Sequence, residues 1–328
     1  MKHSLLRILA CPHCRGRLIP AKEQAAGADL VSGHLQCSGC SRHYPVENGI
    51  PRFVDPHNYA DSFGFQWNVF SKTQLDSYSG VPISRGRLHA TTGWDWSRMQ
   101  GKKILDVGCG AGRFAEVALQ SGAEVVGVDY SKAIDAAQSN LSGSPRFSAV
   151  QASIFELPFV PGSFDFVYCL GVLQHTPDPQ QAFARLPEQA KNGGRIAVDV
   201  YPLLWTNLFW SKYWVRPFTK KMRSDRLLRL VQRAVPSLLQ MSRRLAAIPL
   251  LGRKLKYLVP VVNYESVYAL SEQQLQEWAV LDTFDMLSPE HDHPKSESTV
   301  RRWLAEASLA DIEVFRTGHV IGRGTKVR

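Results

Sequence analysis

Short apolar runs alternate with segments of helical spacing between residues 103 and 201. Strands that alternate with helices form parallel sheets with helices on both faces, so the pattern predicts an α/β fold. The alternation stops at 203–290, after which one helix and a closing hairpin are expected. The predicted strands are 103–107, 124–129, 147–151, 164–171 and 195–201; the predicted helices are 113–120, 134–140, 179–191 and 298–307; the hairpin strands are 312–315 and 319–326.

The chain divides into five predicted segments, and the first is too short to fold without a metal. The second is rich in aromatic residues and is expected to supply helices and a flap over the α/β domain. The segments are a small ribbon domain (1–57), an aromatic helical lead (58–100), the first part of the α/β domain (101–202), a helical insertion or cap (203–295), and the closing helix and hairpin (296–328).

The composition is that of a globular protein. The chain has 328 residues, of which 44% are hydrophobic and 21% are charged, and this excludes wholesale disorder. No run approaches the roughly 18 apolar residues of a membrane-spanning helix. The apolar stretch near the N-terminus is short and is broken by Arg7, so it does not resemble a signal peptide. We therefore expect a cytoplasmic protein, with attachment to the inner membrane face as an open alternative.

Four of the six cysteines are paired by spacing. Cys11 and Cys14 form one CxxC motif, and Cys37 and Cys40 form a second, with 22 residues between the two. In a cytosolic chain this spacing indicates zinc rather than disulfides, because two CxxC turns supply the four thiolates of a tetrahedral ion. The alternative is a ribbon that has kept its shape and lost its metal.

The residues that flank the two CxxC motifs resemble those of a known family. Residues 5–12 (LLRILACP) and 44–51 (YPVENGIP) resemble the small zinc-ribbon family of methyltransferase activator subunits. The resemblance covers most of the first 57 residues. Methyl transfer needs no metal, so the zinc is expected to have a structural or recruiting role.

A glycine turn follows the first predicted strand of the α/β domain, in residues 104–113 (ILDVGCGAGR). Glycines let the backbone approach a ligand closely, and the start of a helix favours an anionic group. A dinucleotide-binding fold would require GxGxxG. Here the third glycine comes one residue early, and Asp106 lies two residues before Gly108, which favours S-adenosylmethionine over NAD.

This stretch and those after it resemble the class I S-adenosylmethionine-dependent methyltransferases, especially the subgroup with quinone-biosynthesis enzymes. The further matches are 125–131 (VVGVDYS), 156–159 (ELPF), 162–167 (GSFDFV) and 191–195 (KNGGR). The resemblance implies a Rossmann-like sheet over roughly 101–202 and 296–328. It also implies that Asp129 binds the ribose hydroxyls, Tyr130 packs on the adenine, Gly108 and Gly110 line the methionine end, and Asp106 orients the ammonium group.

The sequence departs from the family pattern at one position. Ser153 stands where the family has an aspartate for the adenine amino group, so that contact is expected to be weaker. Leu170 and His175 lie in 170–178 (LGVLQHTPD), where the family has its active-site mouth. His175 is either a general base or a residue packed beside the adenine.

The insertion carries most of the positive charge. Between Tyr201 and Tyr264 there are 13 lysines and arginines against one acid, so the segment's +12 exceeds the +10 of the whole chain. An apolar stripe is predicted from residues that recur at helical spacing, namely Leu227, Leu230, Val231, Ala234, Leu238, Met241 and Leu245. Three interpretations stay open: a cap over the active site, a cap that lies on an anionic membrane, and a groove for RNA phosphates. A polar run near the end of the insertion contains Asp282, Asp285, His291 and His293. The two histidines are either substrate or metal residues or ordinary loop residues.

The sequence therefore predicts a methyltransferase that uses S-adenosylmethionine and carries structural zinc. The expected acceptor is small or lipid-linked, such as a quinone precursor or a polyprenyl-linked sugar. One alternative is methylation of a ribosomal or transfer RNA base. Another is a non-catalytic scaffold that binds S-adenosylmethionine while its ribbon recruits a partner. The oligomeric state is left open.

Overall fold

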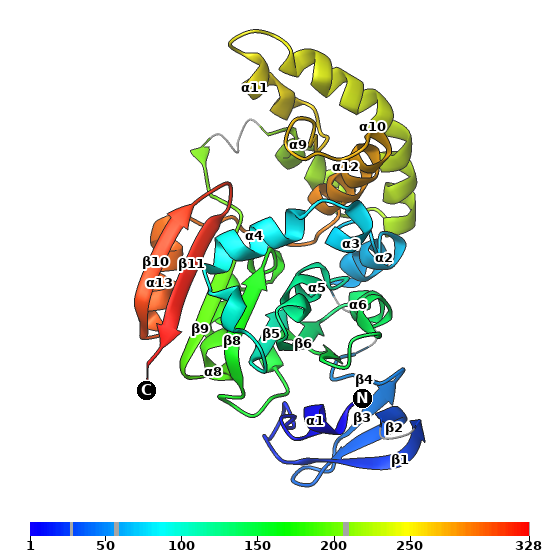
Figure 1. The fold of residues 1–328 in the computed structure, drawn as a ribbon. Helices are drawn as coiled ribbons and strands as arrows, with labels where there is room; N and C mark the ends of the chain where they lie inside the picture. Colours follow the sequence, from blue (N-terminus) through cyan, green and yellow to red (C-terminus); the bar gives the residue numbers. More distant parts are fainter. Residues whose placement is uncertain (27–28, 56–58, 206–209, 328) are drawn as a thin grey trace.

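The computed structural model describes residues 1–328 apart from 27–28, 56–58, 206–209 and 328. The predicted boundary at 57/58 lies outside the described residues, and the other predicted segment boundaries stay predictions. Figure 1 shows a small sheet at the N-terminal end, a larger sheet with helices in the middle, and a helical layer at the far end.

A seven-stranded sheet forms the centre, in the order β10-β11-β9-β8-β5-β6-β7. Strands β5 to β9 run parallel where they pair, whereas β11 pairs antiparallel with β9 and with β10. The predicted parallel sheet and closing hairpin are thus confirmed. The strands are β5 (Lys103–Val107), β6 (Glu124–Asp129), β7 (Phe147–Gln151), β8 (Phe164–Leu170), β9 (Ala190–Val200), β10 (Leu309–Arg316) and β11 (Val320–Lys326).

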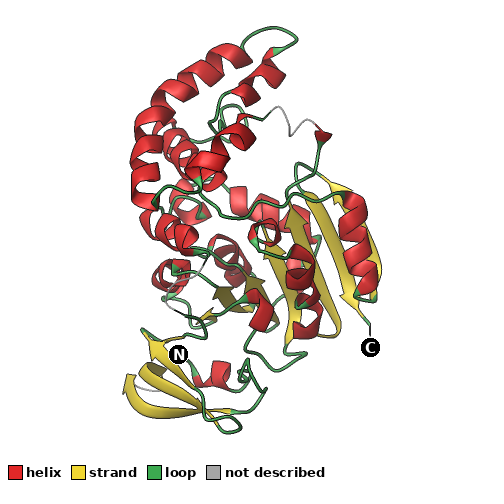
Figure 2. Cartoon of the chain, turned by 180° about the vertical axis from the view of Figure 1, so that it is seen from behind, coloured by secondary structure: helices red, strands yellow, loops and turns green. Residues whose placement is uncertain are grey.

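Helices cover both faces of this sheet (Figure 2). On one face Phe183 and Trp303 pack with Val198 in one apolar cluster. On the other, Phe114 and Leu88 pack with Ile104 in a second cluster. The covering elements are α4 (Ile83–Thr92), α5 (Arg113–Gln120), α6 (Ala133–Leu141), α7 (Pro179–Ala184), α8 (Leu186–Gln189) and α13 (Glu297–Glu306), with short 3-10 helices η1 (Trp96–Arg98), η2 (Ile154–Glu156) and η3 (Leu173–His175).

The single helix predicted over 179–191 is wrong. It is divided into α7 and α8, and β9 begins at Ala190. Pro187 occupies the first turn of α8, a position that does not need the N–H group that proline lacks. The proline therefore starts a new helix instead of continuing the old one.

The N-terminal ribbon packs on the edge of the large sheet beside β7. Its own sheet has the order β1-β2-β3-β4. The amide of Phe53 donates to the carbonyl of Gln151 at 2.8 Å, and Arg52 bonds Asp135 at 2.6 Å. These contacts cover an otherwise unpaired strand edge. The elements are α1 (His3–Leu6), β1 (Leu18–Ala26), β2 (Asp29–Cys37), β3 (His43–Glu47) and β4 (Ile50–Pro51).

The insertion forms a separate helical layer. Its apolar cluster joins Val235 and Leu239 to Phe284. The buried stripe is shifted from the predicted one: Leu230 and Met241 are exposed, and Leu228 is buried in their place. The layer contains α9 (Ser211–Thr219), α10 (Ser224–Ala246), α11 (Gly252–Leu255), η5 (Lys256–Leu258) and α12 (Glu272–Leu287), and the lead contributes α2 (Asp61–Val69) and α3 (Asp76–Ser79).

Within the described ranges, none of the helices combines the length and the apolar character needed to cross a membrane.

Candidate active site and candidate metal centre

The glycine turn lies between β5 and α5 and has backbone angles that side chains disfavour. Gly108 and Gly110 have φ values of 77° and 54°. A Cβ atom at Gly108 would lie 2.3 Å from Val172, and one at Gly110 would lie 3.3 Å from the indole nitrogen of Trp67. The turn is therefore a narrow cradle that glycine keeps open.

Asp129 at the end of β6 is bonded to this turn. Its Oδ2 accepts from the amide of Gly110 at 2.9 Å, and its Oδ1 accepts from the amide and the hydroxyl of Ser131 at 2.8 and 2.7 Å. Burial raises the pKa of Asp129, and the bonds from Ser131 and Gly110 oppose that shift. The carboxylate is thus held rigidly beside the turn.

Asp106 is buried inside β5, with 1% of its surface exposed. Burial raises the pKa of its carboxyl to about 8. Its Oδ2 atom has no partner of good hydrogen-bond geometry among the described residues, although the nearby hydroxyl of Tyr168 holds the pKa of the carboxyl lower than burial alone would. A buried polar atom of this kind normally has a partner, so it fits a site completed by a polar ligand or water.

One cavity of about 1010 Å³ opens at this edge of the sheet. The turn, Tyr130 and Leu170 line it, and so do residues of α4, the insertion and the closing hairpin. Of the residues singled out in the sequence, the cavity wall includes Gly108, Gly110, Asp129, Tyr130, Leu170 and His175.

Asp106 and Ser153 are not among the lining residues. The hydroxyl of Ser153 accepts from the amide of Phe155 at 3.2 Å and caps η2. Ser153 therefore already has a local structural partner.

His175 is buried in the cavity wall, with 7% of its surface exposed. Its Nδ1 lies 3.1 Å from the carbonyl oxygen of His291, and its ring is edge-on to Tyr201 at 5.4 Å. Burial lowers the pKa of His175, so the ring is neutral near pH 7. With Nδ1–H donated to the carbonyl, the other ring nitrogen is an acceptor.

Arg87 and Asp199 hold the ends of β8 and β9 together. The guanidinium contacts Asp199 through Nη2 at 2.8 Å and Nε at 3.1 Å, and the amide of Gly171 donates to Asp199 Oδ1 at 2.6 Å. Burial raises the pKa of Asp199, but the charges of Arg87 and His319 and the hydrogen bonds from Arg87 and Gly171 together outweigh burial, so the pKa of Asp199 is lowered. Sequence reasoning missed this pair, because neither residue belongs to a motif.

The insertion also contributes acidic and aromatic residues to the cavity. Asp282, Asp285, Tyr264 and Trp278 all line it. Asp282 and Asp285 stood out in the sequence only as part of a polar run that ends in His291 and His293. The rings of those two histidines stack at 5.7 Å. Neither belongs to a potential metal-binding group in the described part of the chain.

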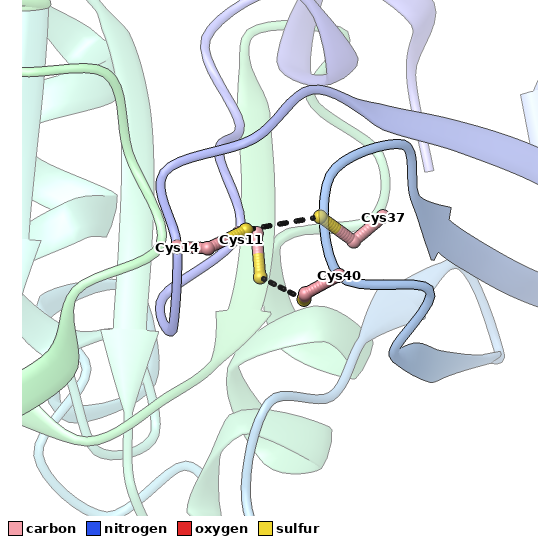
Figure 3. A group of neighbouring side chains, drawn as sticks. All are labelled: Cys11, Cys14, Cys37 and Cys40. Atoms are coloured by element: carbon pink, nitrogen blue, oxygen red, sulfur yellow. Dashed lines mark hydrogen bonds between the residues drawn. The ribbon is translucent and has the colours of Figure 1, made fainter.

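The four cysteines of the ribbon form one cluster (Figure 3). Their sulfur atoms all lie within 4.8 Å of one another, with 3.7 Å between Cys11 and Cys40 and 3.4 Å between Cys14 and Cys37. Zinc–sulfur bonds of about 2.3 Å in a tetrahedron place sulfurs about 3.8 Å apart, so the cluster fits a four-cysteine zinc site. Gly16 keeps the centre open, because a Cβ there would lie 2.9 Å from the sulfur of Cys37.

Two family models match parts of this chain. Residues 105–198 match the family model "Methyltransferase domain", and residues 2–49 match the family model "Trm112p-like protein". The chain thus combines a methyltransferase domain with a Trm112p-like N-terminal domain.

Curated relatives match the methyltransferase part. The ubiquinone biosynthesis O-methyltransferase of Nitrosospira multiformis is 40% identical over 106 residues, which is 30% of this chain and 43% of the relative. The ubiquinone biosynthesis O-methyltransferase of Chromobacterium violaceum is 42% identical over 102 residues, which is 29% of this chain and 43% of the relative. The chain therefore spans less than half the length of these relatives.

Solved structures show weaker likeness. Phosphoethanolamine N-methyltransferase 2 of Haemonchus contortus, in complex with S-adenosyl-L-methionine, has a TM-score of 0.46 at 17% identity, with 84% of this chain and 48% of that chain covered. Magnesium protoporphyrin IX methyltransferase of Synechocystis, with bound SAH, has a TM-score of 0.42 at 16% identity, with 82% and 96% covered.

Proposed function

We propose that this protein is an S-adenosylmethionine-dependent methyltransferase that acts on a small or lipid-linked acceptor. The observation that carries the proposal is the single cavity that joins the glycine turn and Asp129 to the walls supplied by the insertion. It is larger than one nucleoside needs, so a second molecule can meet the first in it. The named relatives, which are O-methyltransferases of ubiquinone biosynthesis, favour a quinone-type acceptor and an oxygen nucleophile.

The residues fit the nucleoside. The cradle at Gly108 and Gly110 admits the methionine end without side-chain contact. Asp129 accepts the ribose hydroxyls and Tyr130 packs on the adenine, while Asp106, which does not line the cavity, orients the ammonium group through water. Leu170 supplies apolar wall, whereas Ser153 does not line the cavity and gives at most a weak contact to the adenine amino group.

Methyl transfer requires few chemical groups from the protein itself. When bound, the sulfonium supplies an activated methyl group. The protein must align the acceptor with it and exclude water. Arg87 and Asp199 fix the strand ends that form the floor, while Trp278 and Tyr264 close the cavity from the insertion. A catalytic role for His175 stays a prediction.

Incubation with methyl-labelled cofactor and fractionated lysate tests this function. We expect label in small or lipid-extractable products. Label in RNA would support the alternative of a base methyltransferase. Tight cofactor binding without transfer to any fraction would support the scaffold.

We also propose that the protein works at the surface of an anionic membrane. Most of the exposed large apolar side chains in the described residues lie between 203 and 267, and among them Leu250 is fully exposed and Phe218 is 75% exposed. Lys220, Lys221 and Arg244 are exposed close to them in sequence. Exposed apolar and basic side chains together favour an anionic bilayer. Figure 1 places the α10–α11 end of the insertion far from the ribbon.

Flotation with phosphatidylglycerol vesicles tests this location. Leu250→Ser with Leu251→Ser is expected to reduce the bound fraction severalfold, because two apolar side chains no longer enter the bilayer. The control is Ile19→Ser, an exposed apolar residue of the ribbon. Equal binding by both variants, or salt-dependent binding of RNA in place of vesicles, would contradict the membrane proposal.

A further inference from the structure

Two similar hydrogen-bonded groups, each of three side chains, lie where the insertion meets the cavity. Asp282 and Asp285 lie three residues apart on α12, so they project from the same side of the helix. Both line the cavity. Each carboxylate accepts from one glutamine and one tyrosine.

The hydrogen bonds of the first group, around Asp282, are shorter than those of the second, around Asp285. Tyr264 donates to Asp282 Oδ2 at 2.5 Å, and the Nε2 group of Gln74 donates to Oδ1 at 3.0 Å. Arg113 donates to Oε1 of Gln74, so the amide nitrogen of Gln74 must face Asp282. In the second group, Gln66 donates to Asp285 at 3.2 Å and Tyr201 at 3.5 Å.

These contacts leave Asp282 free to accept more. A carboxylate has about four lone-pair sites, and among the described residues Tyr264 and Gln74 use two of those on Asp282. The two donors fix its position, while its other sites are left for a ligand in the cavity. Asp282 thus has the geometry of an acceptor for a hydroxyl proton.

The residues around Asp282 determine the pKa of its carboxyl group. Burial and the neighbouring Asp285 raise the pKa of Asp282 to about 7, against the hydrogen bond from Tyr264 and the charges of Arg113 and Arg87. Tyr201 and Tyr264 also face it, and burial keeps both phenols neutral by raising their pKa well above the usual value. A base is most effective when its pKa lies near the working pH. His175, with its lowered pKa, is the weaker base.

We propose that Asp282 takes the proton from the acceptor hydroxyl during methyl transfer, with Gln74 and Tyr264 as positioning residues. This rests on the proposed function. The acceptor O–H proton moves to the Asp282 carboxylate, and the oxygen forms a bond to the methyl carbon. The carbon–sulfur bond breaks with its electron pair going to sulfur, which leaves a neutral thioether and a methyl ether. Asp282 then returns the proton to solvent.

The test uses the full chain with catechol and 4-nitrocatechol as acceptors, since the cavity is lined by aromatic rings and 4-nitrocatechol is the stronger acid. In the wild type, methylation of catechol is expected to rise with pH through about 7, because Asp282 must be ionised. Asp282→Asn should lower the catechol rate by about 10²- to 10⁴-fold and remove this rise, because a general base contributes about that much. The loss should be at least about tenfold smaller for 4-nitrocatechol, which needs less help in losing its proton.

Catechol binding tests the role of Asp282 independently of the methylation rate. With S-adenosylhomocysteine present, catechol affinity of the wild type should increase severalfold from pH 6 to pH 8, because the hydroxyl donates to an ionised carboxylate. Asp282→Asn should show no such increase. Its affinity for S-adenosylhomocysteine should stay within twofold of the wild type, which also shows that the variant is folded.

Tyr264→Phe tests the positioning role. Loss of the donor raises the pKa of Asp282, so the rise in rate moves to higher pH while the plateau is kept. A merely structural role would lower the plateau without moving the pH profile.

Two results would overturn the proposal. One is an Asp282→Asn enzyme that keeps the pH-dependent rise, and loss of that rise in His175→Ala would then assign the base to His175. The other is a wild type that binds S-adenosylmethionine and labels lysate products but methylates neither catechol. A wild type that does not bind S-adenosylmethionine at all would instead refute the proposed function.

Discussion

The amide of Gly110 donates a 2.9 Å hydrogen bond to Oδ2 of Asp129, linking the glycine turn after β5 to the end of β6. The bond fixes a carboxylate at the mouth of the cavity before any ligand arrives. Ser131 holds the other oxygen. The nucleoside site is therefore preorganised, and Asp129 has little rearrangement to make on binding.

Replacement of Asp129 by Asn should weaken S-adenosylmethionine binding about 10- to 100-fold, because the ribose hydroxyls lose a charged acceptor. Isothermal titration calorimetry measures this. Asp311→Asn, an exposed aspartate of the closing hairpin, serves as the control and should bind normally. Equal affinity in both variants would show that Asp129 does not hold the ribose.

Replacement of Cys37 and Cys40 by Ser should release about one zinc ion per chain and unfold the ribbon, because folding of so small a domain is coupled to its metal. Metal analysis and limited proteolysis of the ribbon give the two readouts. Cys169→Ala, a buried cysteine outside the cluster, should keep the zinc. Fresh wild-type protein without zinc would refute the metal assignment.

Arg52→Ala should destabilise the attachment of the ribbon by about 1–3 kcal/mol, because a largely buried guanidinium loses charged and polar partners. Arg52 is 12% exposed and contacts Asp135 at 2.6 Å and Gln151 at 2.7 Å. Arg98→Ala is the matched control, since its pair with Asp95 is at the surface and should contribute little to stability. Urea unfolding compares the two, and similar losses would count against this role of Arg52.

His175→Ala should slow methyl transfer at least about tenfold while cofactor affinity stays nearly constant, because the ring shapes the acceptor side of the cavity. Steady-state rates and calorimetry separate the two effects. An unchanged rate would leave His175 as a packing residue next to Phe63 and Tyr201.

The central fold could be predicted because its signals are local. The buried strand 103–107 and the glycines after it are contiguous in sequence, and their conformations follow from burial and from the absence of a Cβ atom. The cysteine cluster could be predicted for the same reason, since each CxxC turn offers two sulfurs by itself.

The acceptor side could not be predicted, because tertiary packing determines it. Gln74 and Asp282 are 208 residues apart in sequence and meet only when α12 folds over the lead. Arg87 and Asp199 are 112 residues apart. In α10, periodicity indicated an apolar stripe, but contact with α12 decided its phase and left Leu230 and Met241 exposed.

The central claim is that the glycine turn and Asp129 bind S-adenosylmethionine. A crystal structure with S-adenosylhomocysteine tests it most directly. We expect the methionine end over Gly108 and Gly110 and both ribose hydroxyls on Asp129. A turn left empty, or the nucleoside bound elsewhere on the protein, would contradict the account.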